Sequence, residues 1–145
     1  MIALLQRVSR AGVTISGKTA GRIGRGLLVF VAVHRDDEER DITRLAERIL
    51  TYRVFPDAEN RMNRSVVDIS GELLLVPQFT LTADTRKGTR ASFSKGAKPD
   101  KAVAYFEKLV TACEKELESV ATGQFGANMQ VSLVNDGPVT FWLES

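Results

Sequence analysis

The chain has 145 residues, the length of one compact domain, and its 43% apolar and 26% charged residues supply a hydrophobic core and a soluble surface. We therefore expect a single domain over residues 1–145. No apolar run reaches the roughly 18 residues of a membrane-spanning helix and no cleavable leader opens the chain, so a cytoplasmic protein without a membrane partner is expected. The only cysteine, Cys113, and the only histidine, His34, exclude an internal disulfide and a zinc site built on clustered Cys and His ligands.

Positive charge is concentrated in one segment, although the whole chain carries only +2. Residues 84–98, here called the basic loop, have a net charge of +4 from one acid, Asp84, and five basic residues: Arg86, Lys87, Arg90, Lys95 and Lys98. Lys and Arg attract backbone phosphates without reading sequence, so this loop suits a phosphate-bearing partner. An ordinary solvated loop is the alternative.

The N-terminal third is predicted to form strands. Short glycine-punctuated strands are expected at Ile2–Val8, Gly12–Ser16 and Thr19–Ile23, with a turn around Gly17. Leu27–Val33 is a continuous, β-branched apolar run, which is typical of a strand buried on both faces. We expect this run to be the central strand.

Two helices are predicted, one on each side of a pair of short strands. Asp36 and Glu39 resemble a capping box, and apolar residues at helical spacing follow, which indicates a helix over Asp37–Tyr52. Strands are expected at Ser65–Val67 and Glu72–Val76, around a turn that ends at Gly71. Pro99 suits the first turn of a second helix, Pro99–Leu117. Its apolar stripe is Ala102, Phe106, Leu109 and Cys113, so Cys113 is predicted to be a buried core residue.

The chain is predicted to end in a hairpin, with strands at Gln130–Val134 and Val139–Leu143 around a turn at Asn135–Pro138. The helices are too few to cover both faces of a parallel sheet. We therefore expect an α/β fold in which mixed β-sheets are layered with two helices.

Common catalytic motifs are absent. The glycines of Gly21–Gly26 precede a strand instead of opening a helix, and Ser92 and Lys95 match a serine acyl-enzyme pattern without its partner motifs. An enzyme of this sequence must use backbone donors, hydroxyls or groups of its substrate. Two segments stand out by their position: Val76–Leu81, which places polar and aromatic side chains at the end of a strand, and Asn135–Thr140.

These two segments, with Met1–Val8, Ser92–Ala97 and Met129–Trp142, make the chain resemble the D-aminoacyl-tRNA deacylase family over essentially its whole length. The resemblance implies a barrel-like homodimer that hydrolyses the ester of a D-amino acid, or of mischarged glycine, on tRNA and rejects L-aminoacyl-tRNA. It implies no metal and no organic cofactor. Aminoacyl-tRNA is the expected partner, and DNA is not.

The resemblance also implies the site residues. Gln78, Phe79 and Thr80 match the catalytic segment, where backbone N–H groups around Gln78 and Phe79 form an oxyanion hole and the RNA 2′-hydroxyl assists. Thr80 is assigned a positioning role because it has no evident base. The expected substrate-binding residues are Gly137, Pro138, Met129, Arg7 and Phe93.

Within this set, a cis Gly137-Pro138 element reaches into the partner subunit's pocket and Arg7 orients it. The tRNA backbone is expected to meet Arg86, Lys87, Arg90 and Lys95. The sequence departs from the family at Pro77, where serine is common, and at Ala91, where proline is frequent.

A non-catalytic RNA-binding module is the competing interpretation. Such a module would also use the basic loop, but it would need neither the Gln78–Thr80 segment nor Gly137-Pro138. The presence of both segments favours the enzyme.

Overall fold

The structure, a computed structural model, describes all residues 1–145. Its elements in chain order are β1 (Ile2–Ile15), β2 (Lys18–Ile23), β3 (Gly26–Ala32), α1 (Glu39–Thr51), β4 (Phe55–Pro56), β5 (Met62–Arg64), β6 (Glu72–Pro77), the 3₁₀ helix η1 (Phe79–Thr82), α2 (Pro99–Glu114), β7 (Val120–Thr122) and β8 (Met129–Glu144). Neither helix has the length and apolar character needed to cross a membrane.

Strand β1 organises the main sheet. Strand β8 pairs with it in antiparallel fashion along one edge, while β3 and then β2 pair with it along the other edge. Strand β6 follows β3 in parallel, and β7 follows β6 in parallel. The expected mixed sheet is therefore confirmed.

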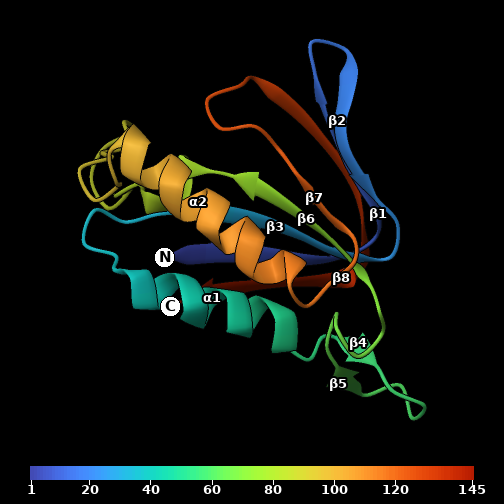
Figure 1. Ribbon diagram of the computed structural model, residues 1–145. Coiled ribbons are helices and arrows are strands. Elements are labelled where there is room, and N and C mark those ends of the chain that lie inside the picture. Colours follow the sequence, from blue (N-terminus) through green and yellow to red (C-terminus); the bar gives the residue numbers. More distant parts are fainter.

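The two helices lie side by side over one face of this sheet, as Figure 1 shows. Alternate residues of β3 point to the two faces: Leu27 and Val29 pack in the core beneath the helices, whereas Leu28 packs in a second, smaller core. The sheet curls over this second core and brings β2 close to β7. A Cβ added to Gly21 of β2 would lie only 3.0 Å from the Thr122 carbonyl of β7. The result is a nearly closed, barrel-like sheet, and the prediction of a central strand buried on both faces is confirmed.

Both predicted helices are present, with small shifts at their ends. Helix α1 begins at Glu39, and the Asp41 carboxylate accepts the Glu38 N–H at 2.7 Å, so the capping pair lies two residues later than predicted. This hydrogen bond lowers the pKa of Asp41. Helix α2 ends at Glu114, and Cys113 is buried as predicted; burial raises the pKa of its thiol to about 12.

The predicted break between Ile2–Val8 and Gly12–Ser16 is wrong, because β1 runs unbroken from Ile2 to Ile15. Gly12 is paired with Arg22 on one side and with Ser132 on the other. Pairing along both edges holds the glycine in the extended conformation.

The predicted C-terminal hairpin is also wrong. Residues 129–135 and 140–144 do not pair with each other, because both pair with β1 as parts of the single strand β8. Val8 pairs with Asn135 and Gln6 with Thr140, so the four residues Asp136–Val139 bulge opposite Arg7 alone. The segment predicted as a turn is this bulge.

The predicted strand at Ser65–Val67 is a turn. The Ser65 N–H donates to the Asp68 carboxylate at 2.7 Å, and the Asp68 N–H donates to the Ser65 hydroxyl at 3.1 Å, which replaces ladder pairing. The strand lies just before it, as β5, and forms with β4 a small arm beside the sheet (Figure 1). Strand β7 was not predicted.

Candidate active site

A cleft of about 480 Å³ lies where β6 ends, and it brings together two of the predicted site segments. The cleft is lined by Pro77, Gln78, Phe79, Pro99, Phe125 and Met129, among others. The Gln78 side-chain amide donates to the Thr80 hydroxyl at 2.6 Å. This hydrogen bond links the Gln78 and Thr80 side chains.

The backbone of this segment supplies donors, but not all those expected. The Gln78 N–H donates to the Val31 carbonyl at 2.7 Å, so it is already used. Phe79 and Thr80 are the first residues of η1, and the first N–H groups of a helix have no acceptor within that helix. Any oxyanion-binding donors therefore come from Phe79 and Thr80.

Aromatic and sulfur-bearing side chains flank these donors. The Phe79 ring is 57% exposed and lies against Phe93, with ring centroids 5.1 Å apart. The Met129 sulfur accepts the Gln124 N–H at 3.3 Å. The structure thus places Phe93 and Met129 beside the Gln78–Thr80 segment, as the sequence resemblance implied.

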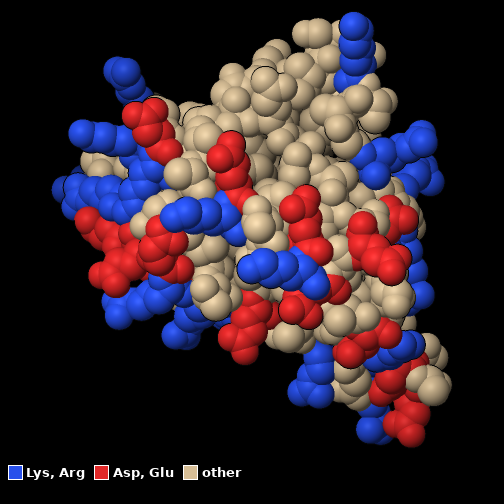
Figure 2. Space-filling view, viewed as in Figure 1, with Lys and Arg blue, Asp and Glu red and all other residues tan.

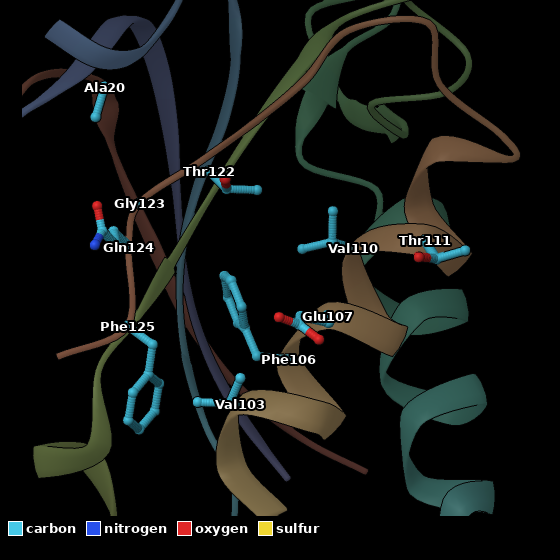
Figure 3. A pocket seen from close by; sticks show the side chains of 10 residues that line it. All are labelled: Ala20, Val103, Phe106, Glu107, Val110, Thr111, Thr122, Gly123, Gln124 and Phe125. Carbon is cyan, nitrogen blue, oxygen red and sulfur yellow. The ribbon is translucent and has the colours of Figure 1, made fainter. Parts of the chain in front are cut away.

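The loop after β7, residues 123–128, is a part of the cleft that the sequence analysis missed. A Cβ on Gly123 would be 2.8 Å from the Met129 sulfur, so this glycine allows the loop to pack directly against the cleft. Phe125 also lines a neighbouring pocket of about 530 Å³, whose other side is α2 with Val103 and Phe106 (Figure 3). An aromatic residue between Gly123 and Gly126 was the signal available in the sequence.

Gly137 and Pro138 do not line this cleft. The bulge that carries Gly137 begins after Asn135, which lies six positions from Met129, or about 20 Å along the extended part of β8. The Gly137-Pro138 peptide bond is cis, as the resemblance implied. The chain therefore presents the cleft and the Gly-Pro element at separate places.

Two side chains hold the bulge that carries Gly137-Pro138. Arg7 donates from Nε to the Asp136 carbonyl at 2.8 Å and from Nη1 to the Val54 carbonyl at 2.6 Å. The Asn135 side-chain oxygen accepts the Val139 N–H at 2.8 Å, which closes the bulge at its base. Arg7 lies where the resemblance implied, whereas Asn135 was not predicted as a site residue.

The basic loop contacts the cleft through Phe93, which packs against Phe79. The loop lies at the left in Figure 1. Figure 2 shows Lys and Arg side chains at this end of the molecule, with acidic side chains among them. Asp84 accepts both side-chain and backbone N–H groups of Arg86, and these hydrogen bonds hold the pKa of Asp84 well below its usual range. Arg86 is thus paired within the loop, while Lys87 and Arg90 are exposed.

The family described as D-Tyr-tRNA(Tyr) deacylase matches residues 4–144. The chain belongs to this family. D-aminoacyl-tRNA deacylases of Escherichia coli (strain K12 / DH10B) and Shigella boydii serotype 18 are each 56% identical to it over 144 residues, covering 99% of both chains. The resemblance inferred from sequence is confirmed, and with it the prediction that the protein is an enzyme, a hydrolase.

Solved structures show the same fold. A c-Myc DNA unwinding element binding protein matches with a TM-score of 0.95 and 36% identity, covering 100% of this chain and 99% of its own. A probable eukaryotic D-amino acid tRNA deacylase matches with a TM-score of 0.85 and 17% identity, covering 99% and 98%. The second likeness concerns the fold alone.

Proposed function

We propose that the protein hydrolyses the ester bond of D-aminoacyl-tRNA, and of glycine mischarged on tRNA, and rejects L-aminoacyl-tRNA. The observation that carries this proposal is the cleft at the end of β6, which joins Gln78 and Phe79 to Met129 in a chain 56% identical to D-aminoacyl-tRNA deacylases. Such an enzyme corrects the chirality of aminoacyl-tRNA before translation uses it.

In the proposed reaction, water adds to the carbonyl carbon of the aminoacyl ester. The developing oxyanion accepts hydrogen bonds from the Phe79 and Thr80 N–H groups, and the RNA 2′-hydroxyl assists proton transfer. The bond between the carbonyl carbon and the ribose oxygen then breaks, which releases the free amino acid and a tRNA with a restored hydroxyl. Gln78 and Thr80 position the segment, and the reaction uses no metal or organic cofactor.

Chiral selection is proposed to need a second subunit. Gly137 and Pro138 lie beyond Asn135, which is about 20 Å along β8 from Met129, and neither residue lines the same chain's cleft. In a two-fold dimer the bulge of one subunit enters the cleft of the other, where its carbonyl groups face the substrate α-carbon and exclude an L side chain. The half-exposed Trp142 near the chain end belongs to the proposed interface, whereas Phe141 packs against Tyr52 and the main core.

The remaining substrate contacts follow from the rest of the cleft and the basic loop. Met129 and the Phe79–Phe93 pair are proposed to hold the terminal adenosine, since exposed aromatic faces stack on bases. Lys87, Arg90, Lys95 and, to a lesser degree, the paired Arg86 then meet acceptor-stem phosphates. A cytoplasmic location fits this substrate.

One structural relative is named for binding a DNA unwinding element. We propose RNA, not DNA, as the nucleic-acid partner, because the curated relatives at 56% identity are named for acting on tRNA. To test this choice, duplex DNA is added as a competitor while the rate of D-tyrosyl-tRNA hydrolysis is measured. No inhibition is expected at physiological salt.

Incubation of the purified protein with D-tyrosyl-tRNA, glycyl-tRNA and L-tyrosyl-tRNA tests the function. Release of free D-tyrosine and glycine with retention of the L-tyrosyl ester is expected. Sedimentation in parallel tests the dimer, since a fully active monomer would contradict the shared site.

A further inference from the structure

The first 35 residues of the chain carry six basic residues and no acid; the basic residues are Arg7, Arg10, Lys18, Arg22, Arg25 and Arg35. Three of these have partners: Arg7 bonds the Asp136 carbonyl, Arg35 pairs with Asp36, and Arg25 lies over the Phe55 ring at 5.6 Å. Arg10, Lys18 and Arg22 are exposed and form no ion pair. Their charge is therefore available to a ligand.

The strand register brings these charges together. Gly12 of β1 is paired with Arg22 of β2 and with Ser132 of β8, so the three residues form one row across the sheet. Because Gly12 has no side chain, the row contains a hollow of about 210 Å³, which is lined by Arg10, Gly12, Arg22, Ser132 and Val134, among others. Two arginines and one serine are thus among the residues that line the hollow.

The strand segments that form this hollow contribute no acidic residue to offset its positive charge. The chain has no acid before Asp36, and no charged residue of either sign between Glu118 and Asp136. In Figure 2 the tip of the β1–β2 hairpin, at the upper right, carries basic side chains and no acidic ones. We name Arg10, Lys18, Arg22 and Ser132 the β1–β2 face.

We propose that the β1–β2 face binds backbone phosphates of the substrate tRNA close to its aminoacylated end, a proposal that rests on the proposed function. Guanidinium groups match phosphate oxygens with paired hydrogen bonds, and a serine hydroxyl is a common additional phosphate donor. The face holds no aromatic side chain for base stacking, so it contacts the RNA backbone without reading sequence.

The position of the face fits this partner. Strand β8 begins at Met129 in the cleft, and Ser132 follows three residues later, about 10 Å along the strand and on the opposite face of the sheet from Met129 and Val131. When the terminal adenosine of a tRNA occupies the cleft, the nucleotides that precede it extend out of the cleft, and each of them carries one phosphate. Such a chain reaches the β1–β2 face by passing around the edge of β8 that no strand pairs with. Unlike Arg86 of the basic loop, Arg10 and Arg22 are not paired with a carboxylate.

The test is the double variant Arg10→Ala/Arg22→Ala. Its matched control is Arg44→Ala/Lys115→Ala, which removes the same charge from exposed, unpaired positions on the helix side of the molecule. Binding of a 3′-CCA acceptor-stem minihelix is measured by fluorescence anisotropy over a range of salt concentrations. Loss of two phosphate contacts should reduce the slope of log affinity against log salt by about 1.4–1.8 in the double variant and leave the control slope unchanged.

Steady-state hydrolysis of D-tyrosyl-tRNA supplies the second measurement. We expect the KM of the double variant to rise by more than its kcat changes, because the removed contacts lie away from the ester. An unchanged salt slope, or an equal fall in the control, would overturn the proposal. Failure of the wild-type protein to hydrolyse D-tyrosyl-tRNA would instead overturn the proposed function, since minihelix binding reports on the face separately.

Discussion

Arg7 and Asp136 lie opposite each other across the β1–β8 pair, and the Arg7 Nε donates to the Asp136 carbonyl at 2.8 Å. The same guanidinium donates to the Val54 carbonyl at 2.6 Å, and the Arg7 side chain is only 13% exposed. One side chain thus ties the Gly137-Pro138 bulge to the segment after α1. The orientation of the bulge depends on both hydrogen bonds together.

Replacement of Arg7 by methionine should therefore lower both stability and activity. Each hydrogen bond to a charged donor contributes about 1.5–3 kcal/mol, so loss of the two bonds should lower the free energy of unfolding by roughly 3–6 kcal/mol, measured by urea denaturation. Arg7→Lys keeps the positive charge but lacks the several N–H donors of a planar guanidinium. This variant should therefore be more stable than Arg7→Met and less stable than the wild type. Wild-type activity of Arg7→Met on D-tyrosyl-tRNA would show that the bulge needs no such anchor.

Asn135 is expected to act as a second positioning residue for the bulge. Its side-chain oxygen accepts the Val139 N–H at 2.8 Å, and its Nδ2 donates to the Thr140 hydroxyl at 3.0 Å. Asn135→Ala loses both bonds, whereas Asn135→Asp keeps the acceptor, so the alanine variant should lose more activity. At about 1 kcal/mol for a neutral hydrogen bond, the difference is roughly fivefold in kcat/KM. Equal activities of the two variants would contradict this role.

The proposed oxyanion hole makes a prediction about the backbone of Phe79. Proline suits the first position of a helix and removes the N–H, while alanine removes the ring and keeps the N–H. Gln78 before it (φ −142°, ψ 76°) lies outside the α region that proline disfavours in the residue preceding it. Phe79→Pro should lower kcat about 10²–10³-fold below Phe79→Ala in single-turnover hydrolysis of D-tyrosyl-tRNA.

The matched variant for a nucleophilic mechanism is Thr80→Ala. It keeps the Thr80 N–H and should retain most of the activity. An inactive Thr80→Ala, with an aminoacyl ester trapped on Thr80 of the wild-type protein and detected by mass spectrometry, would contradict the backbone mechanism.

The fold was predictable from sequence wherever the local hydrophobic pattern of a segment matches the burial of its residues in the structure. The central strand β3 is apolar throughout because its two faces enter two different cores, and α2 shows its buried stripe in sequence. Strands β1 and β8 were not predictable as single elements. Gly12 and Gly137 look like breaks along the chain. Pairing with distant strands holds β1 extended through Gly12, and it continues β8 along β1 on both sides of the bulge that contains Gly137. That pairing is not a local property of the sequence.

The candidate site was predictable only in part for the same reason. Gln78, Phe79 and Met129 line one cleft, whereas Thr80 does not line it. The Gln78 N–H is already used, because Gln78 extends the pairing of β6 with β3. The contribution of Phe125 depends on the close approach of Gly123 to Met129, which only the packed structure reveals.

Asp84 should limit the contribution of Arg86 to RNA binding. Since hydrogen bonds from Arg86 lower the pKa of Asp84, the carboxylate stays ionised and paired from pH 8 down to pH 5. Any stabilisation from the pair is present above the unfolded pKa of about 3.9 and is lost only as pH falls through the lower folded value. Asp84→Asn should free Arg86 and steepen the salt dependence of minihelix affinity by about 0.7–0.9.

Anisotropy at pH 5 and pH 8 checks the same pairing in the wild-type protein. The contribution of Arg86, taken as the difference between wild type and Arg86→Ala, should be equal at the two pH values. A contribution that grows at pH 5 would mean that Asp84 titrates in that range.

The most direct test of a chirality-selective deacylase is the ratio of kcat/KM for D-tyrosyl-tRNA to that for L-tyrosyl-tRNA, measured with the purified protein and with Phe79→Pro as the inactive control. We predict a ratio of at least about 100, which corresponds to about 2.7 kcal/mol of transition-state discrimination. A ratio near 1, or hydrolysis that persists undiminished in Phe79→Pro, would contradict the account.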